Sequence, residues 1–227
     1  MITATGWRRT ATVLTALAAV LLPAAAPAAA ETLATAGPAA LRRDLPEPPP
    51  ADVVRAELDE LVVEPPHSMD GYSRDRFPHW IKISGECDTR ETVLARDGEG
   101  VIQDELCRAV AGTWVSAYDD RVFTDAKQLD IDHMVPLAAA WRSGADTWTT
   151  AKRRAFANDL VHSQLIAVSA ASNRSKGDKT PDAWRPPTTG YWCTYSRAWT
   201  DTKHVYDLSV TEPEKAALNQ MLDTCTP

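Results

Sequence analysis

The sequence predicts an α+β domain with a small antiparallel sheet. Two strands are expected, one over residues 128–132, where polar and apolar side chains alternate, and one over the short apolar run at residues 164–169. One helix is expected to begin at Asp88, which caps a segment with Glu91 three residues later. Further helices are expected over residues 151–160 and 211–222. Because the helical segments predominate, the sheet should be small.

The first thirty residues have the layout of a secretory signal peptide. Arg8 and Arg9 form a basic start, residues 11–22 carry no charge, and three alanines at 28–30 precede Glu31. A membrane-spanning helix needs about 20 apolar residues, and the run that starts at Ala11 ends before Pro23. We therefore predict a secreted protein whose mature form does not enter a membrane.

Residues 31–66 are rich in alanine and proline and are predicted to form a spacer. Within them Val54, Leu58, Leu61 and Val62 fall at helical spacing, so a short helix here could pack on the domain. The compact domain itself is predicted over residues 67–227.

The mature chain is acidic. Two of the 24 Lys and Arg residues lie in the signal peptide, so 22 oppose 31 Asp and Glu, for a net charge of −9. Proteins that bind nucleic acid by bulk electrostatics are usually basic. The balance argues against such a binder, but it leaves room for an enzyme with a local basic patch.

Four cysteines follow the signal peptide. An even number in an exported chain indicates two disulfide bonds. Three pairings are possible, and we favour the local one, Cys87–Cys107 with Cys193–Cys225. A zinc site is the rival interpretation, but the spacing contains no Cys-x-x-Cys knuckle.

Charged side chains gather at the end of the first predicted strand. Side chains alternate along a strand, so Asp130 and Asp132 share one face while Ile131 points into the core. Two carboxylates on one face are unfavourable unless they are solvated or hold a cation. His133 follows directly, and histidine suits a general base because its ordinary pKa lies near neutrality.

A second polar stretch, residues 172–179, follows the other predicted strand. Asn173 and Asp132 are oxygen donors suited to Mg²⁺ or Mn²⁺. Arg174, Lys176 and Lys179 suit phosphate oxygens. Taken alone, this stretch fits a solvated turn equally well. Together, the two stretches supply the base, the metal ligands and the cations that phosphodiester hydrolysis requires.

These motifs resemble the HNH, or ββα-metal, nuclease family. Asp132-His133 is followed by Val135-Pro136, a strand, and Asn173-Arg174 with Lys176, as in the HNH domain of CRISPR effectors. Residues 72–225 are also similar to small secreted bacterial proteins related to the C-terminal nuclease domain of modification-dependent restriction enzymes.

The resemblance implies a ββα-metal core and a role for each motif residue. Asp132 and Asn173 would ligate Mg²⁺ (or Mn²⁺), His133 would be the base, and Asn158 would steady the loop that carries the histidine. Asn173 stands where many members have His, and the zinc knuckles of some members are missing. Nothing resembles the nucleotide-dependent partner domain, so no nucleotide cofactor is expected.

We therefore predict a secreted, metal-dependent endonuclease that acts as a monomer on nucleic acid, with DNA favoured over RNA. Two other classes stay open. A non-catalytic extracellular binding module would keep the fold and fits the acidic charge. A secreted peptidase would use Ser169 or Ser172 with His133, but the chain has no G-x-S-x-G motif.

Overall fold

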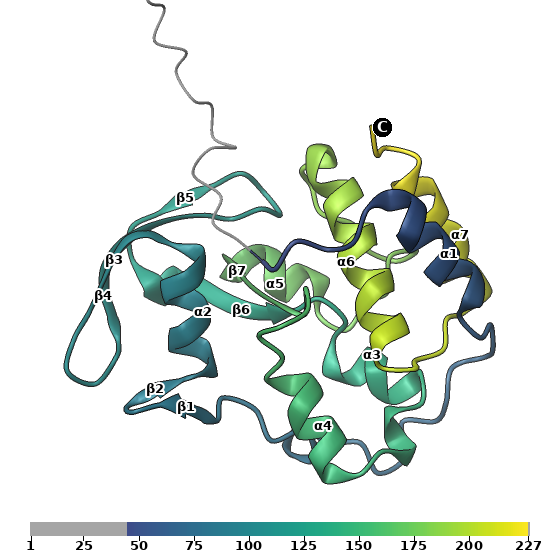
Figure 1. Cartoon of the computed structure of the whole chain (residues 1–227), viewed down its shortest axis with the longest axis horizontal. Helices are drawn as coiled ribbons and strands as arrows, with labels where there is room; N and C mark the ends of the chain where they lie inside the picture. The colour runs from purple at the N-terminus through teal and green to yellow at the C-terminus, as the bar shows by residue number, and fades with distance from the viewer. Residues whose placement is uncertain (1–44, 227) are drawn as a thin grey trace, which may run out of the picture. The chain divides into compact units, whose positions relative to one another are not determined.

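The computed structural model describes residues 45–226 and confirms a mixed α+β architecture with small antiparallel sheets (Figure 1). The predicted signal peptide and residues 31–44 of the predicted spacer lie outside the described residues. The helices are α1 (Ala51–Glu60), α2 (Thr89–Asp97), α3 (Leu137–Arg142), α4 (Thr150–Ala157), α5 (Ala170–Lys176), α6 (Trp192–Val205) and α7 (Glu212–Leu222). The strands are β1 (Lys82–Ser84), β2 (Cys87–Asp88), β3 (Glu99–Gln103), β4 (Ala109–Val115), β5 (Val122–Phe123), β6 (Leu129–His133) and β7 (Leu165–Ser169).

The described part of the predicted spacer belongs to the domain. Helix α1 buries Val54 and Leu58 completely, and Leu45 lies in the same apolar core. A main-chain bridge pairs Val63 with Val210, near the other end of the chain. The apolar side of α1 needs a covering surface, which α6 and α7 supply. The compact domain therefore starts at or before residue 45, not at residue 67.

Strands β6 and β7 form an antiparallel pair, and α5 follows β7 without a loop. The pairing runs without a bulge from Leu129 opposite Ser169 to His133 opposite Leu165. Leu129 and Ile131 face one apolar cluster, as predicted for Ile131, while alternate residues of β7 face the main core. Both predicted strands are correct to within one residue. The pair is buried on both sides and gives the side chains at its ends a rigid support.

The largest departure from the prediction is a three-stranded sheet, β3–β4–β5, whose hairpin lies beside α2 (Figure 1). The indole of Trp114 on β4 donates to Leu94 O on α2 (2.8 Å). The predicted disulfide Cys87–Cys107 joins the hairpin loop to β2, immediately before α2. This sheet is mostly open to solvent and exposes apolar side chains such as Ile102, so its sequence lacks the alternation that marks a half-buried strand.

Helices α1, α6 and α7 pack side by side (Figure 1). Thr211 caps α7 and forms a capping box with Glu214, which explains why the predicted start is correct. The second predicted disulfide, Cys193–Cys225, ties the start of α6 to the end of α7. Among the described residues, no helix is both long enough and apolar enough to cross a bilayer.

Candidate active site

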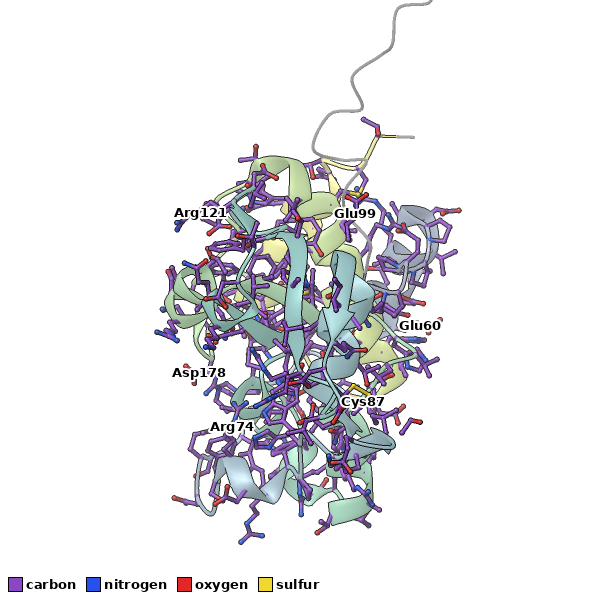
Figure 2. The ribbon with its side chains drawn as sticks, turned by 90° about the vertical axis from the view of Figure 1, so that its left-hand side faces the viewer. Glu60, Arg74, Cys87, Glu99, Arg121 and Asp178 are labelled. Atoms are coloured by element: carbon purple, nitrogen blue, oxygen red, sulfur yellow. A yellow bond between two sulfur atoms is a disulfide. The ribbon has the colours of Figure 1, made fainter. Side chains whose placement is uncertain are left out.

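A cleft of about 240 Å³ lies where the end of β6 meets α5. Figure 2 shows two of its lining residues, Arg74 and Asp178, on the same side of the molecule. Four of the seven predicted site residues line it: Asp132, His133, Asn173 and Arg174. Residues forty positions apart in the sequence are therefore brought together as predicted.

The chain that leaves β6 is held by one buried glutamine. Gln164 accepts from Met134 N through its main-chain oxygen (2.7 Å), and its side-chain amide makes two hydrogen bonds with the main chain of Val135 (3.0 and 2.9 Å). These bonds fix the two residues that follow His133. The histidine is therefore anchored on a rigid backbone rather than on a loop.

His133 is buried, and its imidazole is fixed on two sides. Nε2 donates to Ala157 O (3.0 Å), so the proton sits on Nε2 and Nδ1 keeps its lone pair. The indole of Trp80 lies against the imidazole, with ring centroids 5.6 Å apart. Burial lowers the pKa of His133 to about 3. The imidazole is therefore neutral at physiological pH, and Nδ1 can accept a hydrogen bond.

Asn158 is a buried clamp. Nδ2 donates to two main-chain oxygens, and Oδ1 accepts from one main-chain N–H and one hydroxyl. The partners are Pro78 O, Arg154 O, Ile81 N and Thr89 Oγ1. The resemblance implied that Asn158 steadies the loop that carries His133. In the structure its side chain instead holds the segment that carries Trp80. Its influence on His133 passes through Trp80 and through its chain neighbour Ala157.

Asp132 is buried beside His133 and accepts two strong hydrogen bonds on one oxygen. Tyr118 Oη and Lys176 Nζ both lie 2.6 Å from Asp132 Oδ2. Burial raises the pKa of Asp132, and the ammonium of Lys176 acts against that rise. Because both donors bind Oδ2, Oδ1 is the oxygen left for a ligand in the cleft.

Lys176 is not placed to contact phosphate, so this prediction is wrong. Its side chain is completely buried, and Nζ also donates to the main-chain oxygens of His133 (2.8 Å) and Met134 (3.0 Å). An ammonium has three hydrogens, and all three are used. The charge is tolerated inside the domain because Asp132 balances it.

Asn173 and Asp130 complete the polar side of the cleft. Asn173 Nδ2 donates to Asp130 Oδ2 (3.2 Å), which leaves the Asn173 carbonyl oxygen available as a ligand. Arg174, which is 76% exposed, lies 3.5 Å from the same carboxylate oxygen and can turn toward a substrate. Lys179 is exposed, bonds to Ser175 O and does not line the cleft.

The donors at the cleft fit a hard divalent cation. Asp132 and Asn173 offer carboxylate and carbonyl oxygens, with Asp130 beside them. Residues 45–226 contain no group of three or more His, Cys, Asp or Glu side chains that could hold a metal. Mg²⁺ needs no such cage, because it is commonly held by one or two protein oxygens, substrate phosphate and water.

Comparison with known proteins gives the family. A sequence model described as GmrSD restriction endonucleases, C-terminal domain, matches residues 93–221, which is more than half of the chain and includes the motif residues Asp132, His133, Asn158 and Asn173. The chain belongs to this family. The match confirms the predicted relationship to the nuclease domain of modification-dependent restriction enzymes. No solved structure matches this chain.

A relative in the fungus Arthroderma benhamiae is described as an uncharacterized secreted protein. It is 56% identical over 180 residues, covering 79% of this chain and 88% of the relative. The relative and the two disulfides confirm the predicted extracellular location. The similarity also extends beyond the bacterial proteins that the sequence suggested.

Sequence reasoning missed several residues around the site of this GmrSD C-terminal domain. Tyr118 and Trp80 contact Asp132 and His133 from distant segments, and no local pattern marks them. Arg74 lines the cleft, and its Nε lies 3.3 Å from His79 Nε2. An isolated arginine in a loop carries no sequence signal of such a role.

The peptidase alternative does not fit the geometry. The hydroxyls of Ser169 and Ser172 both donate to Asp119 Oδ2 (2.5 and 2.8 Å). His133 bonds instead to Ala157 O. Among the described residues these serines therefore have a carboxylate partner and no histidine base.

Proposed function

We propose that this protein is a secreted, metal-dependent endonuclease that hydrolyses DNA phosphodiesters. The observation that supports this most is the cleft that holds Asp132, His133 and Asn173 together. We further propose that β6, β7 and α5 form a ββα-metal core, since two antiparallel strands are followed directly by a helix. The family is named for restriction endonucleases, which favours DNA over RNA. The enzyme would act as a monomer without a nucleotide cofactor.

His133 would act as the general base. Its bond to Ala157 O leaves Nδ1 free to accept a proton from the attacking water. Trp80 covers one face of the ring and Asn158 holds Trp80 in place, so the imidazole keeps a single orientation. Such preorganisation of the base lowers the barrier for attack at phosphorus.

Asp132 and Asn173 would hold Mg²⁺ or Mn²⁺ through one oxygen each. When bound, the metal neutralises charge at the phosphate and helps the 3′ oxygen to leave. Arg174 and Arg74 would contact substrate phosphates from the rim, and Lys179 would do so from outside the cleft. These three side chains are the cations that the acidic protein would offer to a substrate phosphate.

A plasmid-nicking assay on the oxidised mature protein tests the proposal. We expect Mg²⁺ or Mn²⁺ to support cutting and EDTA to abolish it. The products should carry 5′-phosphate and 3′-hydroxyl ends. His133→Ala should lose the activity, whereas His204→Ala, which changes a partly exposed histidine on α6, should keep it.

The contrary outcome identifies the alternative. No metal-dependent cutting of plasmid, single-stranded DNA or RNA by the folded wild-type protein would rule out the endonuclease. Binding of nucleic acid without cutting would then point to the binding module.

A further inference from the structure

Lys176 occupies an unusual position for a lysine beside a proposed metal site. It enters from α5, is fully buried, and its ammonium binds Asp132 Oδ2 and the main-chain oxygens of His133 and Met134. Trp199 lies against the other side of the ammonium, 5.6 Å from Nζ to the ring centroid. Lys176 therefore joins the helix that carries Asn173 to the strand end that carries Asp132.

The contacts divide the two oxygens of Asp132 between two tasks. Lys176 and Tyr118 occupy Oδ2 from inside the protein, and Oδ1 remains for the cleft. The ammonium also cancels most of the carboxylate's charge at close range. A divalent cation in the cleft would then meet one neutralised carboxylate oxygen and one amide oxygen.

Resting on the function proposed above, we propose that Lys176 is a positioning residue that restricts Asp132 to one metal-binding oxygen and keeps the cation affinity of the free protein low. Tyr118 shares this task. Because Lys176 neutralises the charge of Asp132, the substrate phosphate must supply the negative charge that binds the cation. The cation therefore binds firmly only together with nucleic acid.

The chain offers a matched control for this inference. Within residues 45–226, Lys203 is the second lysine whose side chain is fully buried. Its Nζ lies 2.6 Å from Glu214 Oε1, which equals the distance from Lys176 Nζ to Asp132 Oδ2. Lys203 belongs to α6, pairs with Glu214 of α7 and does not line the cleft. Lys203→Met should therefore cause the same kind of damage to the interior without touching the proposed metal ligands.

The experiment is a titration of the free, oxidised protein with Mn²⁺ at pH 7.5, in which electron paramagnetic resonance counts the unbound ion. Lys176→Met frees Asp132 and should tighten Mn²⁺ binding about tenfold, while Lys203→Met should leave the affinity at the wild-type value. Added uncleavable phosphorothioate DNA should tighten binding in the wild type more than in Lys176→Met.

Tyr118→Phe serves if Lys176→Met does not fold. It removes one donor from Asp132 Oδ2 and should tighten Mn²⁺ binding about twofold to threefold. Tyr195→Phe is its control, because the Tyr195 hydroxyl is buried without a hydrogen-bond partner in residues 45–226.

Mn²⁺ affinity that is no tighter in Lys176→Met and Tyr118→Phe than in the wild type, or undetectable in all three, overturns the inference. If the wild type cuts plasmid and only this affinity shift is missing, the inference alone fails. If no metal-dependent cutting occurs either, the proposed function fails with it.

Discussion

Two buried ion pairs with the same chemistry stand in two different regions of this domain. In each, a fully buried lysine lies 2.6 Å from a carboxylate oxygen, and that oxygen accepts a second hydrogen bond from an aromatic side chain. The pair of Lys176 and Asp132 borders the cleft, whereas the pair of Lys203 and Glu214 is enclosed by helices. Trp199 lies between them, since it covers Lys176 and donates to Glu214.

The difference lies in what each carboxylate can still do. Glu214 is buried among the helices, and its side chain also completes the capping box of α7. Asp132 keeps one oxygen for the cleft. The comparison teaches that two buried ion pairs of the same chemistry can differ in whether the carboxylate keeps an oxygen facing a cleft. Only the surroundings distinguish the two roles.

The strongest test of this comparison replaces both carboxylates by amides. Asp132→Asn should lower the nicking rate about 10²–10³-fold, because it removes a proposed metal ligand. Glu214→Gln should keep the wild-type rate below its melting temperature. Each variant should lose about 3–5 kcal/mol of stability in urea unfolding, because a buried ammonium loses its counter-charge. Equal losses of activity would show that the two pairs do not differ in function.

Asn158→Ala should have the next largest effect. It removes four hydrogen bonds, two of which hold the segment of Trp80 through Pro78 O and Ile81 N, at a cost of about 2–4 kcal/mol in unfolding free energy. Nicking should slow about tenfold because His133 loses part of its support. Asn219→Ala, which removes one hydrogen bond on α7, is the control. A wild-type nicking rate in Asn158→Ala would contradict the idea that Asn158 supports His133.

The disulfide Cys193–Cys225 tests the helical region separately. Replacing both cysteines by serine should cost about 4 kcal/mol, because the bond closes a loop of 32 residues. The nicking rate of the folded protein should not change, since the bond lies away from the cleft. Thermal unfolding and nicking at 20 °C measure the two effects. A lower rate there would show that the helical layer shapes the site.

The smallest expected effect is a pH dependence. A hydrogen bond to Asp146 raises the pKa of His67 above its ordinary value of 6.5, so protonated His67 stabilises the fold. This stabilisation is complete below the unfolded-state pKa and disappears as the pH rises through the folded-state pKa. His67 is partly exposed, so the amount should be below about 1 kcal/mol. Melting temperatures from pH 5 to 8 should show it as a difference from His67→Gln, and parallel curves would exclude it.

The part of the cleft that could be read from the sequence is the part carried by short motifs. Asp132 and His133 end a strand whose alternation is visible, and Asn173 and Arg174 follow the paired strand. Lys176 was misjudged because its counter-charge lies 44 positions away and only the folded chain shows that it is buried.

The fold divides in the same way. Strands β6 and β7 and helix α7 have clear apolar spacing or a capping box, and they lie where predicted. Helix α1 also lies where the helical spacing of Val54 and Leu58 suggested a short helix. The β3–β4 hairpin exposes apolar side chains, so its sequence shows no strand pattern. The hairpin depends on contacts with distant segments of the chain, and a single sequence does not show such contacts.

The packing of α1 on α6 and α7 also sets an order of events during folding. The first described helix meets two helices that begin about 140 and about 160 residues later, and Arg55 on α1 pairs with Asp223. Such distant contacts form slowly because a long loop must close first. The packing of α1 on α7 therefore cannot be completed until the last helix has been synthesised. A chain that must be threaded through a membrane before it folds benefits from this delay.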